Sequence, residues 1–71
     1  MRAIQLYDVV ALAEDRPDAG LVRGQVGTVV ESLSNNFLEV EFSDDQGKTY
    51  AMLALPASQL ITLHHAPVHS S

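Results

Sequence analysis

The sequence contains no cysteine, no tryptophan and few basic residues. Without cysteine it can form neither a disulfide framework nor a zinc ribbon, so its fold has to rest on apolar packing. Four Arg and Lys residues stand against nine Asp and Glu residues, which gives a formal charge of −5 and disfavours binding to phosphate backbones. No apolar run approaches the length of a membrane-spanning helix, and no signal-like apolar block follows the first two residues. We therefore expect a soluble, cytoplasmic protein with no membrane partner.

The chain has room for one domain only. A chain of 71 residues buries about 60% of its unfolded surface, and ordering it costs on the order of 100 kcal/mol of conformational entropy. Its residues are 46% hydrophobic and 18% charged, which is typical of a globular protein. We expect one domain over residues 1–63 and a disordered tail over residues 64–71, which holds all three histidines.

Five short segments rich in β-branched and apolar residues alternate with turn-forming segments. They predict strands over residues 7–13, 25–33, 37–42, 49–55 and 60–63, with one 3-10 turn at residues 57–59 before the last strand. No long window has the 3.6-residue apolar period of a helix. A long first loop followed by two tight hairpins, a helical turn and a short last strand is the element order of an SH3-like barrel. The sequence therefore predicts an all-β fold, a small five-stranded SH3-like barrel.

Pairing the third and fourth expected strands on paper predicts which side chains share a face. With Phe42 opposite Thr49, the apolar side chains of both strands point inward. Glu41 then lies opposite Tyr50 and Glu39 opposite Met52. The outer face holds five side chains: Phe37, Glu39, Glu41, Tyr50 and Met52. A bulge next to the turn at residues 44–48 would change this register.

Six segments form an ordered set of motifs: residues 6–12 (LYDVVAL), 14–17 (EDRP), 20–31 (GLVRGQVGTVVE), 39–42 (EVEF), 47–51 (GKTYA) and 55–60 (LPASQL). Together they resemble the domain of unknown function 4926 family, which consists of short bacterial proteins. The resemblance runs from about residue 4 to residue 63. It implies a stand-alone SH3-like barrel from a bacterium and brings no established activity or catalytic residue. Some members resemble partners of neighbouring toxin-like genes, which implies an accessory or antitoxin-like role.

The most specific motif is the glycine-containing segment at residues 23–29 (RGQVGTV). A similar entry to a strand occurs in KOW-type barrels that meet RNA. We interpret its glycines as local, one relieving a positive φ at a turn and the other allowing a close backbone approach. The segment lacks the Gly-Lys-Ser/Thr of a phosphate loop. A KOW-like nucleic-acid-associated module using Arg16, Arg23 and Lys48 is the alternative function.

The composition of the expected domain disfavours catalysis. All histidines follow the last strand and cysteine is missing, so Ser-His-Asp, Cys-His and zinc-hydrolase schemes lose essential members. The acidic segments lack the spacing of a calcium loop. Glu39 and Glu41 point the same way, as a glycosidase pair does, but too little chain surrounds them to form a pocket. We expect no enzyme, no catalytic residue, no metal and no cofactor.

The leading hypothesis is a protein-interaction module that binds one protein partner. The predicted contact residues are Phe37, Tyr50, Met52, Glu39, Glu41 and Arg23, which stand on the outer strand face and in the first loop. An exposed patch of aromatic and Met side chains marks a contact surface. The competing interpretation is that the two rings and Met52 lie under the first loop or complete a second small core. Self-association through sheet edges is a third alternative.

Overall fold

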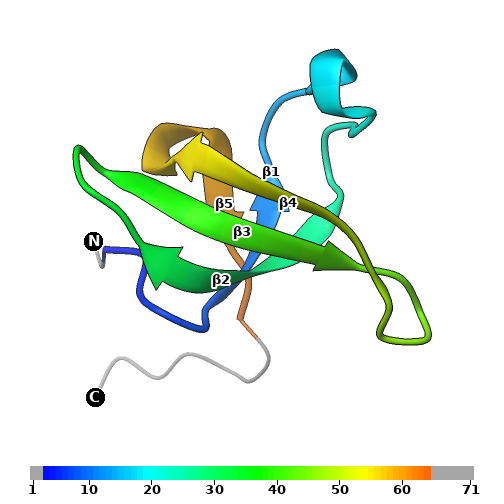
Figure 1. The fold of residues 1–71 in the computed structure, drawn as a ribbon. Coiled ribbons are helices and arrows are strands. Elements are labelled where there is room, and N and C mark those ends of the chain that lie inside the picture. Colours follow the sequence, from blue (N-terminus) through cyan, green and yellow to red (C-terminus); the bar gives the residue numbers. More distant parts are fainter. Residues whose placement is uncertain (1–2, 65–71) are drawn as a thin grey trace.

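Five strands and two single-turn 3-10 helices make up the computed structural model, which describes residues 3–64 (Figure 1). In chain order they are β1 (Val9–Leu12), η1 (Pro17–Ala19), β2 (Val26–Ser32), β3 (Phe37–Ser43), β4 (Thr49–Pro56), η2 (Ala57–Gln59) and β5 (Leu60–Thr62). The all-β prediction is confirmed, as is the 3-10 turn before the last strand. The predicted tail lies, apart from residue 64, outside the described residues.

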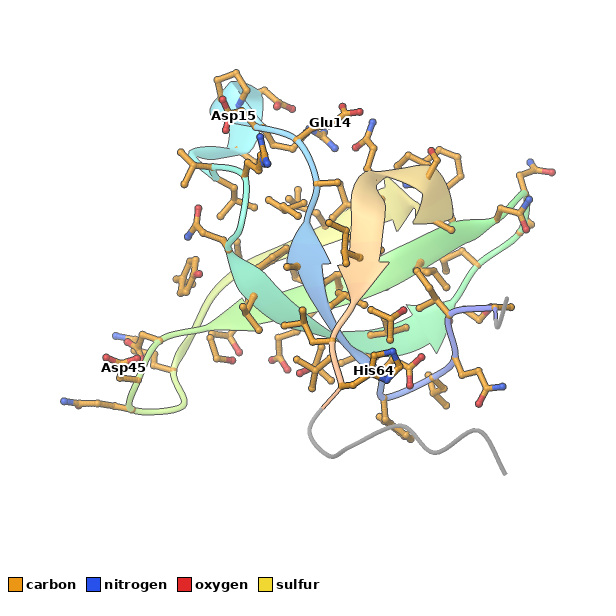
Figure 2. The ribbon with its side chains drawn as sticks, turned by 180° about the vertical axis from the view of Figure 1, so that it is seen from behind. Glu14, Asp15, Asp45 and His64 are labelled. Atoms are coloured by element: carbon orange, nitrogen blue, oxygen red, sulfur yellow. The ribbon has the colours of Figure 1, made fainter. Side chains whose placement is uncertain are left out.

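The strands form one antiparallel sheet in the order β4-β3-β2-β1-β5. Figure 1 shows β1 and β5 behind β3 and β4, and Figure 2 shows the same arrangement from the other side. The two halves of the sheet therefore face each other across the core. Within residues 3–64 no strand pairing joins β4 to β5, so the sheet is open there and its closure into a barrel stays a prediction.

The core lies between the two halves of the sheet. Strand alternation supplies most of it, because every second side chain of a strand points to the same face. Burying each large aliphatic or aromatic side chain contributes about 1.5–3 kcal/mol. The buried cluster consists of Val10, Leu12, Leu21, Val29, Leu38, Val40, Phe42, Leu55 and Leu60.

The first loop contributes one of these core residues, Leu21, and contains the unpredicted helix η1. Pro17 stands at the start of η1, and Gly20 ends it with a φ of +72°. Two backbone hydrogen bonds then join Arg16 to Leu21, with N···O distances of 2.8 and 3.0 Å. The proline and glycine were visible in the sequence as loop residues, and their spacing is that of one 3-10 turn. This turn returns the chain so that Leu21 enters the core.

The two glycines of the segment at residues 23–29 have different structural roles. Gly24 has a φ of +94° and stands in a turn. Gly27 lies on β2, where a Cβ atom would be 2.7 Å from Val40 Cγ1 and 2.8 Å from the Glu41 carbonyl oxygen. The local interpretation of both glycines is confirmed: one allows a turn, and the other allows β2 and β3 to approach closely.

The predicted register between β3 and β4 is wrong by two residues. Phe42 lies opposite Ala51 rather than Thr49, and the register shifts between Phe42 and Ser43. Because Ser43 pairs with Thr49, Tyr50 is the extra residue of a β-bulge. A shift of two preserves which side chains of β4 face inward, so the predicted core survives the error. The same error changes which outer side chains are neighbours.

The first strand is shorter than predicted. It begins at Val9 rather than at residue 7, because Tyr7 has a φ of +70° and cannot continue an extended strand. The Tyr7 backbone N–H still donates to the Val29 carbonyl oxygen, at 2.7 Å. The residues before β1 are thereby held against β2.

Candidate functional site

The bulge turns Tyr50 away from the predicted patch and toward the first loop. Its ring centroid lies 6.4 Å from that of the buried Phe42. Its hydroxyl accepts a hydrogen bond from Gln25 Nε2 at 3.0 Å, and Gln25 Oε1 accepts one from the Val22 backbone N–H at 2.6 Å. Tyr50 is 48% exposed. Tyr50 therefore links β4 to the first loop beside the core while keeping about half of its surface exposed.

Met52 lies with the two glutamates on the outside of the sheet. Glu41 has Met52 on one side and Thr28 on the other, while Glu39 lies opposite Ala54. Met52 is 49% exposed. We call the four side chains on β3 and β4 the acidic strand face: Glu39, Glu41, Met52 and Ala54. The Thr49 hydroxyl donates a hydrogen bond to the Glu41 carboxylate, which holds Glu41 over the strand.

Phe37 stands at the far end of β3, opposite Pro56. Pro56 stands four positions after Met52, which corresponds to about 13 Å along β4. Phe37 is 39% exposed and lines an open groove of about 800 Å³, formed mainly by the β2–β3 turn, η2 and β5. The residues at both limits of the described chain, Ala3 and His64, also line this groove. Phe37 therefore belongs to another surface than Met52.

Arg23 is exposed in the first loop. Its backbone N–H donates to Asp15 Oδ1 at 2.8 Å, and it follows Val22 at the end of the molecule that carries Tyr50. The six predicted contact residues thus fall into three places. Glu39, Glu41 and Met52 are neighbours on the acidic strand face. Tyr50 and Arg23 lie at the end of the molecule next to the first loop. Phe37 lines the groove near η2 and β5.

The acidic strand face carries negative charge that is not balanced locally. Glu39 and Glu41 belong to β3, and β4 contains no charged residue at all. Among residues 3–64 neither glutamate forms an ion pair with a basic side chain. The face therefore presents two carboxylates and a half-exposed thioether without a cation of its own.

Arg16 is engaged elsewhere. Its guanidinium binds the Asp18 carboxylate at 3.2 Å and approaches Gln59 Oε1 at 3.4 Å. The hydrogen bond from Arg16 lowers the pKa of the Asp18 carboxyl, and the same bond raises the pKa of Arg16. This arrangement ties the first loop to η2, so one of the three basic side chains considered for nucleic acid has a structural partner.

The acidic strand face ends at an open sheet edge, because β4 pairs with β3 alone within residues 3–64. The Ala57 N–H donates to the Asn36 carbonyl oxygen at 2.9 Å, and the Phe37 carbonyl oxygen accepts from the Leu33 N–H on the β2 side at 2.8 Å. Hydrogen-bonded and non-hydrogen-bonded pairs alternate along an antiparallel ladder. Residues 51, 53 and 55 therefore direct their backbone groups to β3, while Met52 and Ala54 direct theirs away from the sheet.

Sequence reasoning did not single out this edge, although a signal existed. The segment at residues 49–56 (TYAMLALP) has no charged residue, whereas charged side chains are a common protection of edge strands. Assigning β4 to an edge required the sheet order, which the sequence pattern did not provide.

Among residues 3–64, no group of three or more His, Asp or Glu side chains is arranged to hold a metal ion. Within the same residues no helix has the length and apolar character needed to cross a membrane.

Fold and surface define a small all-β domain with one long open sheet edge beside an acidic face. The chain belongs to the family described as Domain of unknown function (DUF4926), whose model matches residues 6–62. The family resemblance inferred from the sequence motifs is thereby confirmed. No curated protein and no solved structure matches the chain. The family description names no activity, so the function has to be inferred from the surface.

Proposed function

We propose that this protein is a non-catalytic interaction module that binds one protein partner through the acidic strand face. The observation that carries the proposal is the position of Met52. It is 49% exposed beside Glu41 on a strand without charge. A flexible thioether adapts to different partner surfaces and gains from burial. The partner then covers Met52 and the neighbouring Ala54.

The charge of the face selects the kind of partner. Glu39 and Glu41 have no ion pair within residues 3–64, and the whole chain has a formal charge of −5. Complementary charge speeds encounter and favours the correct partner over others. We therefore propose a basic protein partner in the cytoplasm. An accessory or antitoxin-like role in a bacterium fits this assignment.

Nucleic acid fits the same surface poorly. The acidic strand face would repel phosphates. Lys48 belongs to the same hairpin turn as Asp44 and Asp45, and its backbone N–H donates to Asp44 Oδ1, while Arg16 is paired with Asp18. A KOW-like, nucleic-acid-associated function is therefore an alternative that the following experiment can detect.

The experiment compares two variants at matched positions. Met52 on β4 and Ile61 on β5 are 49% and 52% exposed, and both stand on edge strands. Tagged wild-type protein, Met52→Ser and Ile61→Ser are used as baits in nuclease-treated lysate of the native source. We expect wild type and Ile61→Ser to retain the same stoichiometric protein at moderate salt, and Met52→Ser to lose it.

Two results would contradict the proposal. Equal retention by Met52→Ser and wild type would place the contact elsewhere. A protein retained only when the nuclease is left out, with steep salt dependence, would favour the nucleic-acid alternative. Circular dichroism of each variant serves as the control, since both substitutions are at exposed positions and should leave the fold intact.

A further inference from the structure

The middle of β4 has none of the usual protections of an edge strand. Proteins blunt such edges with short strands, charged side chains, prolines or bulges. In β4 the bulge residue Tyr50 lies near the beginning and Pro56 is at the end. Residues 51–55 between them are uncharged, and the strand spans eight residues. An edge of this length can accept another strand.

The open side of β4 offers a defined set of hydrogen-bonding groups. The ladder alternation directs the backbone N–H and C=O of Met52 and of Ala54 away from β3. An extended segment lying beside β4 would bond with these two donors and two acceptors. Strand addition of this kind derives affinity from the main chain and specificity from alternate side chains.

The side chains beside the edge specify the added segment. A new strand would lie about 4.8 Å from β4, and β3 is one further spacing away. Ala54 lies between that edge and Glu39, and its methyl group leaves space for a long side chain to pass above it. Met52 occupies the corresponding place before Glu41 and can pack against an aliphatic stem. Arg and Lys have such stems with a charged tip.

We propose that β4 binds an extended segment of the partner protein as a sixth strand, and that this segment carries Arg or Lys at two alternate positions facing Glu39 and Glu41. The inference rests on the proposed function and names the chemistry of its partner. The backbone of Met52 and Ala54 holds the segment, and the two carboxylates select its side chains.

The charges favour this occupant over a second copy of the chain. Pairing β4 with the β4 of another copy would bring together two molecules that each carry a formal charge of −5. Such pairing would place two acidic strand faces on one continuous sheet. It would supply no cation to Glu39 or Glu41, because β4 has no basic residue. A basic segment neutralises both carboxylates.

The test uses three synthetic eight-residue peptides with blocked ends. The first alternates Arg with Val, the second alternates Glu with Val, and the third is the Arg peptide with its strand-pairing N–H groups methylated. Binding to the full chain is followed by NMR titration and by amide hydrogen exchange. We expect only the first peptide to bind and to slow exchange at Met52 and Ala54. The amides of Leu53 and Leu55, already bonded to β3, serve as internal controls.

Charge variants test the side-chain part of the inference. Glu39→Gln combined with Glu41→Gln should weaken binding of the Arg peptide by roughly threefold to tenfold, since exposed ion pairs are worth little individually. The matched control is Glu14→Gln combined with Asp45→Asn, which removes the same charge from the first loop and the hairpin tip (Figure 2). The control should change binding less than twofold.

The results separate this inference from the proposed function. No binding of the Arg peptide at about 1 mM, or binding without slower exchange at Met52 and Ala54, overturns strand addition. Equal binding of the methylated peptide does the same. If the native partner is nevertheless lost by Met52→Ser, the interaction function stands without strand addition. A dimeric protein with both amides already protected would show that a second copy occupies the edge.

Discussion

The two edge strands of the sheet differ in length and in what they expose. β5 has three residues, and the Gln59 carbonyl oxygen just before it accepts a hydrogen bond from the Ala13 N–H at 2.8 Å. β4 has eight residues and pairs only with β3. A short edge offers too few groups to template another strand, while a long uncharged one offers a continuous row. The comparison points to β4 as the edge adapted to a partner.

Both edges are nevertheless fixed by the same core. Leu55 of β4 is fully buried, and Leu60 of β5 is 8% exposed. The difference between the edges therefore lies on their outward sides and not in how firmly the strands are attached. Substitutions on the outward sides should separate binding from folding.

The largest expected effect comes from proline at adjacent positions of β4. Leu53→Pro removes an N–H that bonds to β3 and a partly buried side chain that packs against the core. The loss of a core Leu alone typically costs about 2–5 kcal/mol, and a domain this small has little margin. We expect Leu53→Pro to lack a cooperative thermal transition by circular dichroism.

Ala54→Pro is the matched variant. Its N–H points away from the sheet, and proline is tolerated at such edge positions. We expect it to unfold cooperatively and to lose binding of the Arg peptide. If Ala54→Pro were as destabilising as Leu53→Pro, the assignment of outward and inward backbone groups would be wrong.

The next largest effect is a loss of stability from a substitution in β2, in the middle of the sheet. Gly27→Ala places a Cβ atom 2.7 Å from Val40 Cγ1 and 2.8 Å from the Glu41 carbonyl oxygen. Overpacking of this kind costs about 1–3 kcal/mol, measured by urea unfolding. Thr28→Ala, on the next residue and the opposite face, should remain within about 1 kcal/mol of wild type. Equal stability of Gly27→Ala and wild type would mean that β2 and β3 are farther apart than described.

A smaller effect is expected where β4 begins. Tyr50→Phe removes the hydroxyl that accepts from Gln25 Nε2 and keeps the ring beside Phe42. A net loss of about 0.5 kcal/mol is expected, because the bond is partly exposed to water. Binding of the Arg peptide should be unchanged, since the hydroxyl lies toward the first loop. A large loss of peptide binding would show that Tyr50 is part of the contact surface after all.

The smallest effect concerns the ion pair near β5. The pKa of the Asp18 carboxyl is lowered in the folded state by the hydrogen bond from Arg16. Its stabilising contribution is therefore present above the ordinary carboxyl pKa and is lost as the pH falls through the lowered value. Asp18→Asn should lower the melting temperature slightly at pH 7 and should show a slightly smaller decrease on acidification than wild type. Parallel pH profiles would contradict this role.

Strand positions could be predicted because apolar and polar residues alternate along a strand that has one buried face. Leu38, Val40 and Phe42 alternate along β3 and are buried as predicted, and Val10 and Leu12 on β1 follow the same period and are buried too. The beginning of the first strand could not be placed, because nothing in the sequence marked the positive φ of Tyr7.

The candidate site was predicted only in part, for one physical reason. The alternation of apolar and polar residues assigns a side chain to one face of the sheet, but it does not determine which residue of the adjacent strand lies opposite. The bulge at Tyr50 moved Met52 from Glu39 to Glu41 and turned the Tyr50 ring toward Phe42. Because bulges depend on the conformation of a few residues beside a turn, the sequence pattern could not show this one.

The central claim is that β4 has an open edge in the free protein. The most direct test is amide hydrogen exchange of the full chain measured residue by residue, together with its mass in solution. We predict a monomer in which Met52 and Ala54 exchange much faster than residues 51, 53 and 55. Slow exchange at all five positions would contradict the claim, because it would show that something already pairs with the outer side of β4.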